Sequence, residues 1–213
     1  MSIVKLNNRA VKDITTFGSV SSGSLTFIKK ITADNSSTIS FVDGSSSVVF
    51  DSTYKEYLFT FKNIHPVANA CDFLFQFSTN SGSSYGVAMT TTCFQAYHQE
   101  DDNPANLNFR TGTLNSLGND TNFQSISTAD GIGNDNDQCL DGFLRIYNPA
   151  DTTFVKHFMA NATHYTNDNA SMHTFVQGYI NSTSAVNGIQ FKMNNGSSDQ
   201  NTDKGDICLY GIA

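Results

Sequence analysis

The 213-residue chain lacks tryptophan, has only three prolines, and carries twelve Lys and Arg against nineteen Asp and Glu. Because a phosphate backbone is held by several convergent cations, this charge balance argues against nucleic-acid binding. No segment approaches the roughly 18 to 20 apolar residues of a membrane helix, so no membrane insertion is expected. Residues 1–17 carry charges and lack the apolar core of a signal peptide, which predicts synthesis in a cytoplasm.

Cysteine is also scarce. Cys71, Cys93, Cys139 and Cys208 are widely spaced and form no C-x-x-C pair. A secreted scaffold stabilised by disulfides is denser in cysteine, and a thiol within a strand behaves as a small apolar group. We therefore expect four reduced, structural thiols.

The chain is rich in phenylalanine and in small polar residues. It has 17 Phe and 8 Tyr, and only 15% of its residues are charged. Asn, Ser and Thr together make up about a third of it, well above a typical domain. Aromatic side chains suit a pleated, half-buried surface, so this composition favours sheets.

Alternation with a period of two residues is the clearest structural signal. It is strongest at residues 57–61 and 73–77, where phenylalanine or tyrosine occupies every second position. Asp43-Gly44 is typical of a hairpin turn, and a change of phase after Phe27 predicts a bulge near Lys29. Helical spacing never persists beyond one turn. Roughly eight to eleven short strands predict an all-β fold: an antiparallel, jelly-roll-like β-sandwich with long polar loops.

The C-terminal stretch, residues 184–213, predicts two strands joined by a polar, turn-rich link. Ile189, Phe191 and Met193 lie in the first strand, and Ile207 and Leu209 lie in the second. An apolar terminus is costly to leave in water, so we expect the last strand to lie inside a sheet.

This stretch also carries a family resemblance. Gly188-Ile189-Gln190-Phe191, followed by Gly205-Asp206-Ile207-Cys208-Leu209-Tyr210-Gly211-Ile212, resembles the C-terminal hairpin of a family of tailed-bacteriophage virion proteins that end in Gly-x-Ile-x-Leu-Tyr-Gly-Ile. Residues 52–66 (STYKEYLFTFKNIHP) and 75–87 (FQFSTNSGSSYGV) are similar to further segments of that family. The turn at 80–82 departs from the family pattern, which has an acidic residue and paired glycines there.

The resemblance implies a virion structural protein and no enzyme or cofactor. The expected role is a homotrimeric fibre, knob or receptor-binding element of the tail or capsid. Its partners would be further copies, other virion proteins of the capsid, portal or tail, and a host surface glycan. One alternative is a head decoration (cement) protein that binds the capsid lattice. A carbohydrate-binding module is another.

Residues 1–23 differ in character from residues 24–213, which we expect to form a single β-sandwich domain. The N-terminal segment reads either as an attachment arm followed by a linker, or as a first strand and a loop. In the first interpretation its contacts to a partner come from Ile3, Val4, Leu6, Arg9 and Val11. Residues 103–141 are polar and rich in Gly and Asn, which suggests a functional or mobile surface connection.

Two metal sites can be considered. Asp135, Asp137 and Asp141 lie in one Asn- and Asp-rich segment, and closely spaced oxygen ligands suit Ca²⁺. The segment lacks the twelve-residue EF-hand spacing, and a solvated turn rich in Asn and Asp is the alternative. A site made of His157, His164 and His173 is the second candidate, but these spacings match no short metal motif.

Carbohydrate contact is a further candidate function. Exposed aromatic rings with Asn- and Asp-rich neighbours can hold a sugar, and Tyr85, Tyr97, Tyr165 and Tyr179 have such neighbours. The alternative is that these tyrosines pack within the core or an interface. No G-x-S-x-G or comparable nucleophile motif is present.

Overall fold

The computed structural model describes residues 25–102, 104–127 and 131–213, and these residues form fourteen β-strands. The strands are β1 (Leu25–Ser36), β2 (Ile39–Val42), β3 (Glu56–Pro66), β4 (Asp72–Ser78), β5 (Met89–Gln99), β6 (Ala105–Arg110), β7 (Gly118–Asp120), β8 (Gln124–Ser125), β9 (Leu140–Tyr147), β10 (Lys156–Tyr165), β11 (Ala170–Ile180), β12 (Gly188–Asn194), β13 (Asp199–Gln200) and β14 (Thr202–Ile212). No helix in these ranges is long and apolar enough to cross a membrane.

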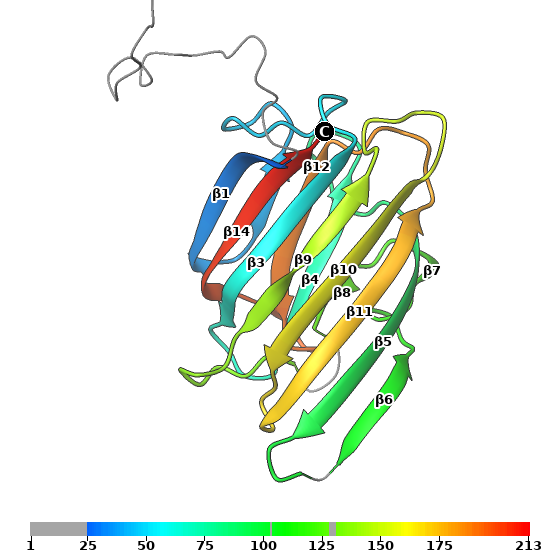
Figure 1. Ribbon diagram of the computed structural model, residues 1–213. Coiled ribbons are helices and arrows are strands. Elements are labelled where there is room, and N and C mark those ends of the chain that lie inside the picture. Colours follow the sequence, from blue (N-terminus) through cyan, green and yellow to red (C-terminus); the bar gives the residue numbers. More distant parts are fainter. Residues whose placement is uncertain (1–24, 103, 128–130) are drawn as a thin grey trace, which may run out of the picture.

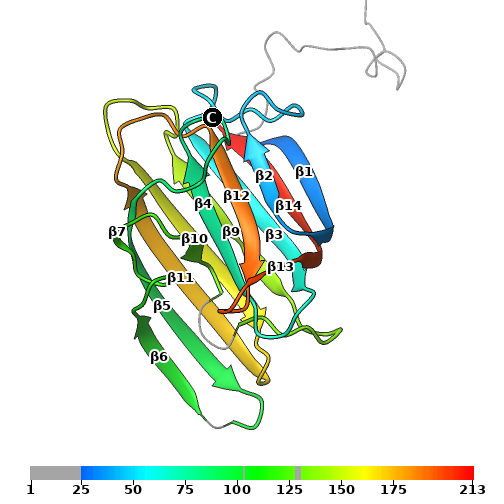
Figure 2. The same cartoon turned by 180° about the vertical axis from the view of Figure 1, so that it is seen from behind.

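The strands form two antiparallel sheets that pack face to face (Figures 1 and 2). The large sheet has nine strands in the order β1-β14-β3-β9-β10-β11-β5-β6, with β7 also paired to β5. The small sheet has the order β13-β12-β4-β8, with β2 also paired to β12. The predicted all-β sandwich is therefore confirmed.

Eight of these strands have the connectivity of a jelly roll. In the large sheet they are β1-β14-β3-β9, and in the small sheet they are β2-β12-β4-β8. The chain crosses between the two sheets at nearly every step, so residues distant in sequence become neighbours. This is the double Greek-key arrangement that buries one face of each sheet.

Two insertions extend the large sheet beyond this jelly roll. Residues 79–123 contribute β5, β6 and β7, and residues 148–187 contribute β10 and β11. Both insertions extend the same edge of the sheet (Figure 1). β10 pairs with β9, and β11 pairs with β5 of the other insertion along eleven residues. The four strands β10, β11, β5 and β6 are called the extension below.

Aromatic rings fill the space between the sheets. Phe191 of β12 lies at the centre, with its ring centroid 5.4 to 6.4 Å from those of Phe41, Phe59, Phe61 and Phe73. Four of these five side chains are completely buried, and Phe61 is nearly so. Edge-to-face and offset contacts of this kind stabilise a core beyond the area they bury. The alternation in the sequence thus places phenylalanine on the inner faces of both sheets.

The final strand, β14, is held between β1 and β3, as predicted. Two glycines of the C-terminal motif have a structural explanation here. Gly205 has φ +127° at a break in the register, where a Cβ atom would lie 2.7 Å from the Asn63 carbonyl oxygen. Gly211 leaves room for the ring of Tyr54, which a Cβ atom would approach to 2.3 Å. The expected bulge near Lys29 is also present, as a register shift between Phe27 and Lys29.

The segment 103–141 differs from the expected surface connection. It contains β6, β7 and β8, and Leu117, Ile126 and Ile132 are buried. Its polar residues enter the interior because they find partners there. The side-chain amide of Gln124, for example, donates to the carbonyl oxygens of residues 114 and 115 and accepts from the Thr91 hydroxyl. The low apolar content of this segment was therefore a poor guide to its burial, because amide side chains can be buried when their hydrogen bonds are satisfied.

Replacing Phe191 with alanine should strongly destabilise the fold. The cavity would open where four other phenylalanine rings meet, so we expect the free energy of unfolding to fall by about 3 to 5 kcal/mol. Phe154→Ala is the matched control, because Phe154 is 71% exposed. Urea unfolding of the two variants provides the measurement. Equal stability of F191A and F154A would contradict this account of the core.

Candidate functional site

One face of the large sheet is not covered by the small sheet, and it carries most of the exposed apolar side chains. This surface, called the outer face, presents every second residue of each strand, for example Phe94 and Ala96 of β5. Eight large apolar side chains are exposed in the described part of the chain. Six of them lie on the outer face: Leu25, Phe27, Phe94, Leu107, Phe109 and Met159.

The extension carries an aromatic row across this face. Strand register places Phe109, Phe94 and Phe175 opposite one another on β6, β5 and β11. The rings of Phe94 and Phe175 stack with centroids 4.7 Å apart. The row continues through Asn161 of β10 to Phe143 of β9. Because Asn161 is smaller than its neighbours, the row is interrupted by a hollow of about 150 Å³ above β10.

This hollow belongs to a line of hollows that follows β10, called the β10 groove. Its floor is formed by the outward-facing residues of β10: His157, Met159, Asn161, Thr163 and Tyr165. Consecutive hollows of about 320, 360 and 150 Å³ share lining residues, first Tyr147 and His157, then Met159 and Gln177. A further hollow of about 400 Å³, lined by Thr163 and Tyr165, continues the line. The groove is thus most apolar in the hollow above Asn161, and polar side chains such as Asp151 and Glu100 join its lining toward the two ends.

Charges on the outer face are paired within the chain. Lys30 Nζ lies 3.2 Å from an Asp206 carboxylate oxygen, and Arg145 lies 3.3 Å from Glu56. The Tyr165 hydroxyl donates to Glu100 at 2.8 Å, and this bond to the carboxylate raises the tyrosine pKa to about 12. Lys62 of β3 and Asp141 of β9 add one charge of each sign to this face, so the outer face is close to neutral, although the whole chain has a net charge of −7.

The predicted glycan-contact tyrosines do not form one site. Tyr165 lies at one end of the β10 groove. Tyr97 is opposite the buried Met172 and points to the other side of the large sheet. Tyr85 lies in the segment between β4 and β5, where its hydroxyl approaches Gly82. Tyr179 lines the groove near its other end.

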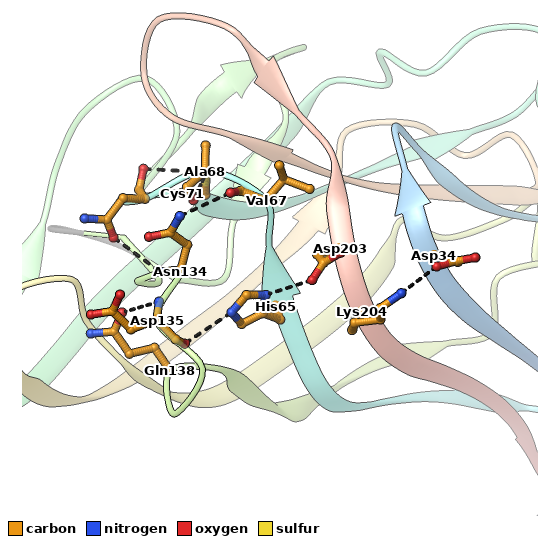
Figure 3. A network of polar contacts seen from close by, with 11 residues as sticks. Asp34, His65, Val67, Ala68, Cys71, Asn134, Asp135, Gln138, Asp203 and Lys204 are labelled. Atoms are coloured by element: carbon orange, nitrogen blue, oxygen red, sulfur yellow. Dashed lines mark hydrogen bonds and ion pairs between the residues drawn. The ribbon is translucent and has the colours of Figure 1, made fainter.

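The predicted calcium site is not assembled. Asp141 lies on β9 and accepts a hydrogen bond from the Asn63 backbone at 2.9 Å. Asp135 and Asp137 lie in the preceding loop, which His65 ties to β3: its ring lies 3.2 Å from the Asp135 carbonyl oxygen and 3.5 Å from Asp203 (Figure 3). Within the described ranges, no three His, Cys, Asp or Glu residues are placed to hold a metal ion.

The three candidate histidine ligands are not brought together either. His157 and His173 are on the outer face, six residue positions apart along the antiparallel β10–β11 pair, and His164 is buried on the inner face. His173 instead hydrogen-bonds the side chain of Asn161 across the strand pair. The residues proposed for partner attachment, Ile3, Val4, Leu6, Arg9 and Val11, lie outside the described residues.

The four cysteines, all within the described ranges, are not joined by disulfides. Cys71 and Cys93 are buried, and burial raises the pKa of the Cys71 thiol to about 11. Such a thiol is a poor nucleophile at neutral pH, because the thiolate is the reactive form. A structural role for Cys71 follows.

Sequence reasoning missed the outer face as a site, although a signal was present. β10 and β5 carry apolar residues at consecutive positions, as in Phe158-Met159-Ala160 and Cys93-Phe94. One residue of each such run must point away from the core, because successive side chains of a strand face opposite sides. A strand that is apolar on both faces indicates a second contact surface.

Comparisons with known proteins leave the family open. No protein-family model and no curated protein matches the sequence. A solved structure of unknown function from Bacteroides ovatus aligns over 52% of this chain and 46% of its own length, with 7% identity and a TM-score of 0.28. This similarity is too low to support an argument about fold or function.

The buried His164 predicts acid sensitivity. Burial lowers its folded-state pKa from 6.5 to about 3, and neither ring nitrogen has a hydrogen-bond partner among the described residues. Between these two values the unfolded chain takes up a proton that the folded chain does not. The free energy of unfolding should therefore fall by roughly 2 to 3 kcal/mol between pH 7 and pH 4.5 on account of this residue.

Urea unfolding at both pH values measures this loss. His164→Met should lose less stability on acidification than the unchanged chain, because the titrating group is gone. His157→Gln is the control, because it removes an exposed imidazole and keeps His164. Its free energy of unfolding should fall between pH 7 and pH 4.5 as much as that of the unchanged chain. The same pH dependence in all three proteins would rule out His164 as the cause.

Proposed function

We propose that the chain is a bacteriophage virion structural protein: a homotrimeric fibre, knob or receptor-binding element of the tail or capsid. The observation that carries the proposal is the apolar outer face, formed mainly by strands inserted into a jelly roll that is otherwise complete. Leu107 and Phe109 are 68% and 62% exposed on it. The C-terminal motif that resembles tailed-phage virion proteins gives independent support.

The energetics favour an assembly role. Exposed apolar area costs about 25 cal/mol per Å², and a contiguous patch on a folded chain usually marks a contact surface. The patch spans β9 of the jelly roll and all four strands of the extension. A virion subunit would bury this surface in its assembled state. Its net charge of −7 would keep the unassembled chain soluble.

Attachment to the particle is assigned to the N-terminal segment. Ile3, Val4, Leu6 and Val11 would supply apolar contacts to another virion protein, and Arg9 would supply a cation. This segment directly precedes β1, an edge strand of the large sheet. The extension lies at the other edge of this sheet, which ends in β6.

Mass spectrometry of purified particles tests the proposal. The chain should be present in particles of a phage that encodes it, in a fixed ratio to the capsid protein. Ile3→Asp with Leu6→Asp should lower that ratio roughly tenfold or more, because two buried apolar side chains contribute several kcal/mol to a contact.

The matched control is Asn7→Asp with Asn8→Asp, which adds the same charge to the same segment and should leave incorporation unchanged. Absence of the chain from the particles would reject the virion assignment. Equal incorporation of both double variants would reject the attachment role. Immunogold labelling of tails or heads distinguishes a fibre or receptor-binding element from a head decoration protein.

A further inference from the structure

We infer that the outer face is the contact surface for a second copy of this chain, with the edge of the extension on one copy seated in the β10 groove of the next. The exposed side chains Leu107 and Phe109 of the edge strand β6 form the projecting part, called the ridge. This inference deepens the proposed function and rests on it only for the expectation of a homo-oligomer.

The outer face has the size that a stable contact between copies needs. Strands about 4.8 Å apart and some ten residues long, with a rise of about 3.3 Å per residue, give the eight-stranded width of this face an area of roughly 1,300 Å². Specific interfaces bury about 800 Å² on each partner. The face therefore offers enough surface for one such contact without using the jelly-roll loops.

The shape of the outer face is complementary to the outer face of a second copy. The ridge lies at the free edge of the sheet, and the groove lies above β10, with β11 between β10 and β5. The groove is apolar where Phe143, Met159 and Phe175 meet, and the ridge side chains are also apolar. Because ridge and groove are different patches, each copy can insert its ridge into the groove of the next, and such head-to-tail contacts form a ring when the rotation between copies closes.

The charge distribution of the chain favours a second copy as the partner that covers the outer face. Two chains that each carry −7 repel, and they can approach most easily where the surface is neutral. The outer face meets this condition, because Lys30 is paired with Asp206 and Arg145 with Glu56. A strongly basic or acidic partner would find no complementary charge there. An apolar, internally neutralised face thus suits another copy of itself.

Light scattering coupled to size exclusion tests the inference on the full chain. The unchanged protein should elute with a mass that is a multiple of 23.2 kDa. Phe109→Glu on the ridge and Met159→Glu in the groove should each reduce the mass to that of one copy. Val67→Glu is the matched control, because Val67 is 47% exposed away from the outer face, and it should assemble normally.

Methionine oxidation gives a second measurement that requires no variant. Met159 is 41% exposed in the single chain, whereas Met89, Met172 and Met193 are buried. On dilution from the assembled to the single-chain state, peroxide should oxidise Met159 at least severalfold faster, and the three buried methionines should change little. An equal rate for Met159 in both states would overturn the inference, as would an unchanged chain that is monomeric at micromolar concentration.

These outcomes separate the inference from the proposed function. A monomer that is found in virions would reject the outer-face contact and leave the virion assignment standing. An assembly that depends on Phe109 and Met159 but never enters particles would do the reverse. A monomer that binds a soluble polysaccharide through the β10 groove would also overturn the inference and make this face a glycan site.

Discussion

The structure depends on the packing of phenylalanine rings between the two sheets. Phe191 contacts rings from both sheets, and its strand β12 lies between β2 and β4, which the chain supplies near its beginning. Phe75 and Phe77 of the small sheet extend this packing to Phe158 of β10 in the large sheet, so ring contacts join the two sheets over much of their area. The two C-terminal strands close this core from opposite sides and do not pair with each other, because β12 lies in the small sheet and β14 lies in the large sheet between β1 and β3.

The two insertions add strands that carry apolar residues on both faces of the large sheet. The inner faces of β10, β11 and β5 contribute Phe158, Val176 and Cys93 to the core, so the extension is held firmly. Its outer faces carry Phe94, Phe175 and Met159, and Phe94 and Met159 remain 37% and 41% exposed in the single chain. A sheet that is apolar on both sides is stable only if something covers the second side. This imbalance is the observation that supports the proposed assembly role.

The fold was largely predictable, whereas the site was not. Alternating phenylalanines at 57–61 and 73–77 correctly indicated strands with one buried face, and the phase change after Phe27 indicated a real bulge. The segment 103–141 was misjudged because Gln124 and Ser127 are buried and hydrogen-bonded despite their polarity. Asp135, Asp137 and Asp141 are close in sequence, yet a strand end and the loop held by His65 separate them.

By itself, the sequence determined which side chains alternate, and hence that the chain forms two-faced strands with an aromatic core. It could not determine which strands become neighbours, because a jelly roll pairs segments more than a hundred residues apart, as in β1 with β14. Only the tertiary structure brought β5 beside β11, and so aligned Phe109, Phe94 and Phe175 into one row. Strand pairing is a long-range choice, and a surface built across strands exists only once that choice is made.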